Sequence, residues 1–229
     1  MSTQHQSPPV YFWRETDPET GYLSQWYYCP FRDDKDESIV YDTAEHFMMY
    51  QKALLFGDSR VAAQVLAPGL HPRKIKALGR KVAGFDEATW VQHREGIVRR
   101  GNVLKFTRAV SCEEAPRKGT TTAAAGTPHH HLRSNKTKSG GGGGGGGGGK
   151  SDHGAVVPPP ALIQDSLREM LMATGDREIV EASPYDAIWG IGFTERDAEA
   201  MREHWGENLL GKALMEVRRE LRESQSDKN

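Results

Sequence analysis

Ten consecutive glycines, at positions 140–149, interrupt this 229-residue chain and set the first limit on how it can fold. The segment around them, 111–157, is otherwise rich in Thr, Ala, Lys and His and has few large apolar residues. Such a sequence cannot bury enough apolar surface to offset the conformational entropy that is lost on ordering. We therefore expect 111–157 to be a disordered insertion. The polar, proline-bearing residues 1–10 are expected to form a disordered N-terminus.

A run of three histidines, His129–His131, lies inside the expected insertion and offers potential metal ligands. No Cys or acidic residue stands at a recognisable ligand spacing from them. We therefore interpret the run as low-complexity sequence and predict no metal site.

The sequence beyond the insertion returns to the pattern of a folded segment. Pro158–Pro160 close the insertion, and apolar residues then recur at helical spacing. These residues are Leu162, Ile163, Leu167, Met170 and Leu171. Because the cost of closing a loop rises only with the logarithm of its length, a long insertion between neighbouring elements is tolerated. The two flanks, 11–110 and 158–224, are therefore predicted to form one domain.

The two flanks carry more helix signals than strand signals. Helices are predicted over about 43–56, 86–107 and 208–223. The last of these has an apolar stripe that is typical of a core-facing helix. Strand signals are few and short, at 10–13, 39–41 and 179–182. We expect a helix-dominated α+β fold.

Charge, cysteine content and hydropathy narrow the class of protein. The formal net charge is −1, so no global field draws the chain to nucleic acid or to acidic membranes. With only Cys29 and Cys112, a disulfide framework of the secreted kind is not expected. The sequence has neither a signal-peptide core nor an apolar stretch of about 18 residues, so we expect a soluble, intracellular protein of the cytoplasm.

The segment 42–53 offers the richest choice of chemical groups. Asp42 followed three residues later by Glu45 resembles a capping box, in which the Glu side chain only satisfies a backbone donor. The same helix places Glu45 and Lys52 at i and i+7, so a carboxylate and an amine share one face about ten Å apart along the axis. From spacing alone, a structural or solvated role is the better interpretation for both.

The segment 181–192 leaves its role open. Gly190 and Gly192 would allow the backbone to approach a ligand closely. Ser183 and Asp186 could equally begin a short helix, and Trp189 could be an ordinary core aromatic.

A basic run, 72–81, has the same ambiguity. It includes Lys76 and Arg80, and such runs are usually the solvated face of a helix. The functional alternative is phosphate binding, for which an arginine fork is well suited. No P-loop or GxGxxG sequence supports a known phosphate cradle here.

Taken together, five sequence blocks resemble the NADAR (NAD and ADP-ribose) family, whose fold is also called YbiA-like. The blocks are Leu23-Ser24-Gln25-Trp26, Thr43 to Ala53, Lys76-Ala77-Leu78-Gly79-Arg80, Glu181 to Gly192, and Trp205-Gly206-Glu207-Asn208-Leu209-Leu210-Gly211 with Val217-Arg218. They lie on both sides of the expected insertion. Their order and combination, rather than any single block, make the resemblance specific.

The resemblance implies an N-glycosidase, a hydrolase that cleaves the C–N bond between a phosphorylated ribose and a base or amine. Two substrate types are implied. One is the ribosylamino-pyrimidine intermediates of riboflavin synthesis, and the other is ADP-ribose attached to guanine, as in ADP-ribosyl-guanosine or ADP-ribosylated nucleic acid. No cofactor is expected.

The resemblance also implies roles for residues that spacing left open. Glu45, Lys52 and Asp186 are implied to be catalytic, with Glu45 as acid or base and Lys52 at the reacting sugar. Substrate binding is implied for Trp26, Lys76, Arg80, Trp189 and Gly190. One position departs from the family, which usually has Asn where this chain has Gln25, so the substrate range could differ.

The implied chemistry has clear requirements. Cleaving a glycosidic C–N bond needs charge stabilisation at C1′ and a proton for the departing nitrogen, which a carboxylate and a proton donor supply. Lys52 offers a second route, in which its amine attacks C1′ and forms an imine with the opened sugar. That route needs a neutral amine, so burial or nearby cations must lower the lysine pKa from about 10.4.

Two functions of other classes remain as alternatives. The first is a non-catalytic module that binds ADP-ribose or NAD in the same pocket without cleaving it. The second is an interaction protein that uses the insertion as a tether.

Overall fold

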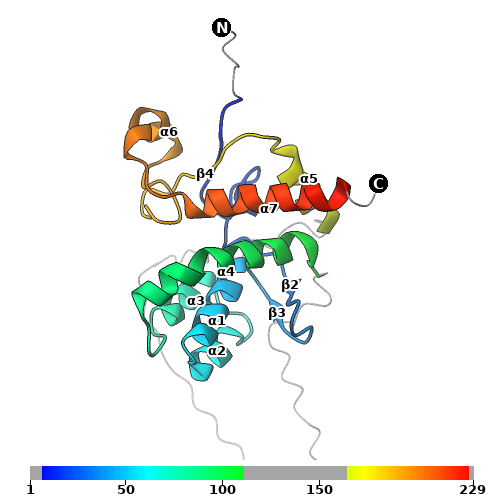
Figure 1. Cartoon of the computed structure of the whole chain (residues 1–229), viewed down its shortest axis with the longest axis vertical. Coiled ribbons are helices and arrows are strands. Elements are labelled where there is room, and N and C mark those ends of the chain that lie inside the picture. The colour runs from blue at the N-terminus through cyan, green and yellow to red at the C-terminus, as the bar shows by residue number, and fades with distance from the viewer. Residues whose placement is uncertain (1–6, 111–163, 227–229) are drawn as a thin grey trace, which may run out of the picture.

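The computed structural model describes residues 7–110 and 164–226 (Figure 1). Its α-helices are α1 (Ala44–Leu55), α2 (Ser59–Val65), α3 (Pro72–Gly79), α4 (Glu87–Thr107), α5 (Gln164–Ala173), α6 (Glu195–Ala198) and α7 (Leu209–Ser226). Its strands are β1 (Val10–Phe12), β2 (Phe31–Arg32), β3 (Val40–Tyr41) and β4 (Ile179–Glu181), and 3-10 helices occupy Gly21–Leu23 and Glu199–His204. The predicted helix-dominated α+β fold is confirmed.

Several sequence predictions fall outside the described residues. They are the insertion at 111–157 with its histidine run, the apolar positions Leu162 and Ile163, and the first six residues. Val10, which we had placed in the N-terminal segment, is the first residue of β1.

A parallel strand pair joins the two flanks of the sequence. Val10 of β1 pairs with Ile179 of β4, and Phe12 pairs with Glu181. The pairing continues one residue further, because the Ala182 amide donates to the Phe12 carbonyl at 2.8 Å. Since β4 follows the region 111–163, this pair connects the start of the chain to its last third.

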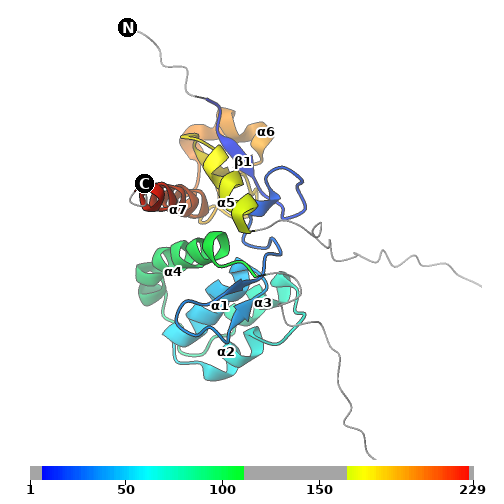
Figure 2. The same cartoon turned by 90° about the vertical axis from the view of Figure 1, so that its right-hand side faces the viewer.

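Helix α4 lies at the centre of the fold, beside α7 (Figures 1 and 2). On one side of α4 are α1, α2 and α3, and on the other are α5, α7 and the β1–β4 pair (Figure 2). The largest hydrophobic cluster contains buried residues from both sides, among them Met49, Ile75, Leu171 and Leu214. The two layers therefore share one core.

A glycine sets the distance between α1 and α3. A Cβ atom at Gly79 of α3 would lie 1.9 Å from the sulfur of Met49 on α1, so a larger residue there would have to displace the Met49 side chain. Met49 lies one turn beyond Glu45, and Lys76 lies one turn before Gly79. The close packing consequently brings the basic face of α3 to the first half of α1.

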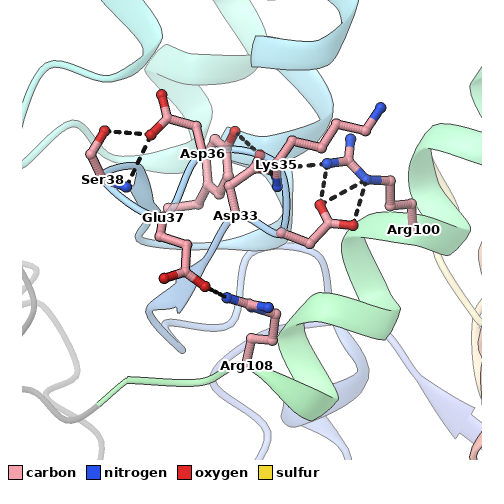
Figure 3. Close-up of polar contacts among 9 residues, drawn as sticks. Asp33, Lys35, Asp36, Glu37, Ser38, Arg100 and Arg108 are labelled. Atoms are coloured by element: carbon pink, nitrogen blue, oxygen red, sulfur yellow. Dashed lines mark hydrogen bonds and ion pairs between the residues drawn. The ribbon is translucent and has the colours of Figure 1, made fainter.

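A polar network fastens the β2–β3 hairpin to α4 (Figure 3). Arg100 of α4 donates to the buried Asp33 carboxylate at 3.0 Å, and Tyr41 donates to the other oxygen of that carboxylate at 2.7 Å. At the C-cap of α4, Arg108 donates to Glu37 at 2.7 Å. Because β3 leads directly into α1, the network also fixes where α1 begins.

The described helices include none that combines the length and the apolar character needed to cross a membrane.

Candidate functional site

Glu45 lies in the first turn of α1, but it is not part of a capping box. Thr43, not Asp42, is the N-cap, and its hydroxyl accepts from the His46 amide at 3.4 Å. The Glu45 side chain is only 5% exposed, and its Oε1 has no hydrogen-bond partner among the described residues. The capping prediction is therefore wrong by one residue, and Oε1 of Glu45 is a buried oxygen that no described residue hydrogen-bonds.

Burial is the largest influence on the pKa of Glu45. Removal from water raises its pKa from 4.5 to about 7. The positive charge of Lys76, a hydrogen bond from Trp26 and the charge of Arg80 act in the opposite direction, while the negative charge of Asp186 raises the pKa further. Near neutral pH this group can therefore hold or release a proton.

A second buried carboxyl, Glu181, was not identified from the sequence. It ends β4, and burial raises its pKa from 4.5 to about 8, assisted by the negative charges of Asp186 and Glu45. Its Oε2 has no hydrogen-bond partner in the described part of the chain. The charge of Glu45 thus acts on Glu181, a carboxyl from a different element, and each of the two has a buried oxygen without a hydrogen-bond partner among the described residues.

Gly190 determines how the turn after β4 packs against Glu181. A Cβ atom there would lie 2.6 Å from the Glu181 carbonyl oxygen and 2.9 Å from that of Asp186. The close approach that we expected for this glycine is thus made to the protein's own backbone. No helix begins at Ser183 or Asp186, because the segment between β4 and α6 forms turns.

Asp186 organises this turn and connects it to α3. Its Oδ1 accepts from the amides of Ile188 and Trp189, at 3.0 and 2.9 Å. Its Oδ2 lies 3.8 Å from the Lys76 ammonium group. One oxygen of Asp186 therefore accepts hydrogen bonds within the turn, and the other faces Lys76.

Trp26, Arg80 and Trp189 are the other residues that we expected to line the pocket. Trp26 hydrogen-bonds to Glu45 and meets the His71 ring edge to face, with centroids 5.9 Å apart. Arg80 caps α3 on the exposed surface, and its charge reaches Glu45. Trp189 is half-buried, and its ring lies 6.0 Å from the guanidinium carbon of Arg94.

Lys52 occupies an aromatic clamp at the other end of α1. Its ammonium group lies 4.1 Å from the ring centroid of Phe85 and 5.0 Å from that of Trp90. Burial lowers its pKa below 10.5, while the negative charges of Glu87 and Glu45 oppose that shift. The influence of Glu45 agrees with the shared helical face that the spacing predicted.

Gln25, the position that departs from the resemblance, supports Glu45 through the backbone. Its carbonyl accepts from the Glu45 amide at 3.0 Å. Its side-chain oxygen accepts from the buried Asn102 of α4 at 3.2 Å. The longer side chain of Gln is therefore held against α4.

The structure brings together most of the residues expected to form a site. Glu45, Lys76, Arg80 and Asp186 interact electrostatically, and Glu181 joins them. Within the described ranges, no group of three or more His, Cys, Asp or Glu side chains is arranged to hold a metal ion. The side chains gathered around Glu45 include carboxyl groups, a lysine, an arginine and the Trp26 ring.

Comparisons with known proteins identify the family of the chain. A family model described as the NADAR domain matches residues 11–222. N-glycosidase R617 of Acanthamoeba polyphaga mimivirus is 32% identical over 202 residues, which cover 86% of each chain. Protein irg-1 of Caenorhabditis elegans is 28% identical over 193 residues, or 82% of this chain and 65% of that protein.

A shorter match and a solved structure complete the comparison. N-glycosidase Npun_R5314 of Nostoc punctiforme is 43% identical over 61 residues, which cover 27% of this chain and 33% of that protein. The NMR structure of Escherichia coli YbiA superimposes with a TM-score of 0.58 at 20% identity, covering 96% of this chain and 88% of that chain. At this identity, the likeness to YbiA supports the fold alone.

Proposed function

The chain belongs to the NADAR domain family, and on that premise we propose that it is an N-glycosidase that hydrolyses a C–N bond to a phosphorylated ribose. Two relatives that carry the name N-glycosidase support the reaction class. The observation that carries the proposal is the pair of buried carboxyls, Glu45 and Glu181, each with an unpartnered oxygen and a raised pKa.

The carboxyl pair suits the hydrolysis of an N-glycoside. A protonated carboxyl gives its proton to the departing nitrogen while the C1′–N bond breaks and its electron pair goes to the nitrogen. The ionised partner stabilises the positive charge that develops at C1′. A water molecule then adds to C1′ and returns a proton to the carboxylate, which leaves a free base and a ribose with a C1′ hydroxyl group.

The remaining residues have supporting roles in this proposal. Asp186 holds the turn after β4 and orients Lys76. Lys76 and Arg80 bind the substrate phosphate, for which two cations on one helix are well suited. Trp26 and Trp189 offer ring faces for the base.

Lys52 has two possible roles, which lead to different predictions. Burial lowers its pKa, which favours the neutral amine needed to attack C1′ and form an imine. The rings of Phe85 and Trp90 instead stabilise the charged form. Borohydride should trap an adduct on Lys52 only if the imine forms, and an adduct that persists in Lys52→Ala would exclude that route.

The two candidate substrates are ribosylamino-pyrimidine phosphates of riboflavin synthesis and ADP-ribosylated guanosine, free or within nucleic acid. The purified full chain should release base from at least one of them, and Glu45→Gln should abolish the release. Folded protein without turnover on either would contradict the proposal. ADP-ribose binding that is unchanged in Glu45→Gln, again without product, would instead indicate a binding module.

A further inference from the structure

One edge of β4 pairs with β1, and the other edge meets the start of α7 (Figure 1). On the β1 side, the Ala182 amide donates to the Phe12 carbonyl at 2.8 Å. On the other side, the carbonyl of Ile179 and the amide of Glu181 have no strand partner within the described residues. Buried backbone groups need hydrogen-bond partners, so this edge of β4 requires them from elsewhere in the fold.

Asn208 supplies both of these bonds through its side-chain amide. Its Oδ1 accepts from the Glu181 amide at 3.0 Å, and its Nδ2 donates to the Ile179 carbonyl at 3.0 Å. An amide side chain carries a donor and an acceptor at one end, so it can replace two backbone groups of a neighbouring strand. Ile191 completes this edge, because its amide donates to the Glu181 carbonyl at 2.9 Å.

The backbone at Asn208 also suits this contact. The residue directly precedes α7 and has a φ of 50°, a left-handed conformation that Asn adopts more readily than most other residues. It is only 4% exposed. A Cβ atom at Gly211 would lie 2.1 Å from the Ile179 carbonyl oxygen and 2.5 Å from Oδ1 of Asn208, so the backbones of α7 and β4 lie in close contact there. The Asn208 side chain is consequently confined between the two elements.

The start of α7 also holds the turn that follows β4. The four consecutive amides of 207–210 donate to the four carbonyls of 187–190, at 2.8 to 3.2 Å. The first amides of a helix have no intrahelical partner, and here the turn satisfies them. The same short segment of α7 thus binds the turn that carries Trp189 and, through the Asn208 side chain, the strand that ends in Glu181.

We propose that Asn208 is a positioning residue for the hydrolysis, which fixes the backbone of Glu181 so that the carboxyl of this residue stays out of water. This inference rests on the proposed function and deepens it, because it assigns a part in that reaction to a residue that acts through Glu181 and not on the substrate. Oε2 of Glu181 has no hydrogen-bond partner in the described ranges, so the place of the carboxyl depends on the backbone that carries it.

The titration of Glu181 can be followed without turnover. In the full chain labelled with carbon-13 at the glutamate carboxyl groups, the Glu181 resonance is the one that is absent from Glu181→Gln. Burial and the charges of Asp186 and Glu45 raise its pKa to about 8, while Lys76 acts in the opposite direction. Asn208→Gly keeps the left-handed backbone and removes both side-chain bonds, so water should reach the carboxyl. We expect its pKa to fall by roughly one unit or more.

Two further variants separate positioning from a general loss of stability. Asn208→Asp keeps an oxygen for the Glu181 amide, loses the donor to Ile179 and adds a negative charge, so the Glu181 pKa should stay at the parent value or rise. Thr174→Val removes a buried hydroxyl that accepts from Arg218 at 2.6 Å, so it should lower stability without moving that pKa. An unchanged pKa in folded Asn208→Gly, a fall in Asn208→Asp or an equal fall in Thr174→Val would overturn the inference. If Asn208→Gly does not fold, Asn208→Asp decides.

Kinetics distinguish this inference from the proposed hydrolysis. Because Glu181 acts on the bond that breaks, Asn208→Gly should lower kcat roughly tenfold or more with little change in KM, and the alkaline limb should move to lower pH. Base release by a parent chain whose Glu181 pKa does not respond to Asn208→Gly would overturn the role of Asn208 alone. A lowered pKa without turnover on either candidate substrate would support the hold of Asn208 on Glu181 and contradict the hydrolysis.

Discussion

At the scale of single residues, Glu45 and Glu181 differ from most carboxyl groups in this molecule. Hydrogen bonds from nearby groups lower the pKa of Asp17, Asp36 and Asp86. Glu45 and Glu181 instead have burial as the largest influence, and it raises their pKa values. Ionising two such groups in the folded protein lowers its stability. Carboxyl groups with strongly raised pKa values are typical of functional sites.

The first prediction concerns the pH dependence of the reaction. The departing nitrogen needs a protonated carboxyl, and the pKa values of about 7 and about 8 place the loss of that proton just above neutrality. We expect kcat/KM to fall about tenfold per pH unit above pH 8. In Glu181→Gln the carboxyl with the higher pKa is gone, so any remaining activity depends on the proton of Glu45, and the alkaline limb should move to lower pH, near 7. An alkaline limb above pH 9 in the parent chain would contradict this assignment.

The second prediction concerns stability, measured as the free energy of unfolding in urea at pH 5 and pH 8. The folded pKa of Glu45, about 7, lies above its unfolded value of 4.5, so the folded state binds more protons between these pH values. Stability from this group is therefore lost as pH rises, by about 3 kcal/mol at 1.36 kcal/mol per unit. Glu45→Gln cannot ionise, so its stability relative to the parent should increase from pH 5 to pH 8. If the stability difference between Glu45→Gln and the parent chain did not change with pH, folding would not raise the pKa of Glu45.

What the sequence revealed of the site differs from residue to residue. Spacing placed Glu45 and Lys52 on one helical face, but only the family resemblance favoured chemistry over capping. Glu181 was missed because nothing local distinguishes it from an exposed residue at the end of a strand. Its pKa is raised by burial and by the negative charges of Asp186 and Glu45, and tertiary structure produces both effects.

At the scale of elements, α4 is unusual because it carries polar side chains into the core. Lys105 is 1% exposed, and its ammonium group donates to the carbonyls of Tyr22 and Ser24 at 2.6 and 2.9 Å. These carbonyls belong to the loop that continues to Gln25 and Trp26, both of which contact Glu45. Lys105 is therefore positioned to hold that loop in place.

The third prediction follows from this contact. Lys105→Met keeps much of the side-chain volume but leaves two buried carbonyls without their donor, which should lower the free energy of unfolding by about 1–3 kcal/mol. Loosening the loop should also reduce kcat/KM. Lys212→Met on the exposed face of α7 is the matched control and should change neither quantity. Full stability and activity in Lys105→Met would mean that the loop holds its position without this lysine.

Long periodic elements were predictable from the sequence, and short ones were not. Helices α1, α4 and α7 begin within one residue of their expected starts, and the apolar stripe of α7 is the clearest of the local signals. Helix α2 and strand β2 were missed, since seven and two residues give too little periodicity. The β1–β4 pairing could not be predicted, because the partner of each strand lies beyond 111–163 and no local pattern encodes it.

At the scale of the whole molecule, the two flanks depend on each other. The largest hydrophobic cluster joins Val61 and Trp90 from the first flank with Leu167, Leu214 and other residues of the second. Between the flanks, Arg94 of α4 also pairs with Glu207 at 3.1 Å. The apolar surface of each flank is therefore buried in large part against the other flank.

The fourth prediction tests that connection. Replacing 111–157 with a Gly-Ser linker about a quarter as long should leave the fold and the base release intact, because buried residues such as Trp90 and Leu214 join the flanks directly. The shorter loop loses less entropy on closure, so the free energy of unfolding should rise by about 1 kcal/mol. A linker of the original length and scrambled sequence serves as the control and should match the parent. If both replacements unfold or lose activity, the segment contributes contacts of its own and is not merely a connection; if only activity is lost, it takes part in substrate binding.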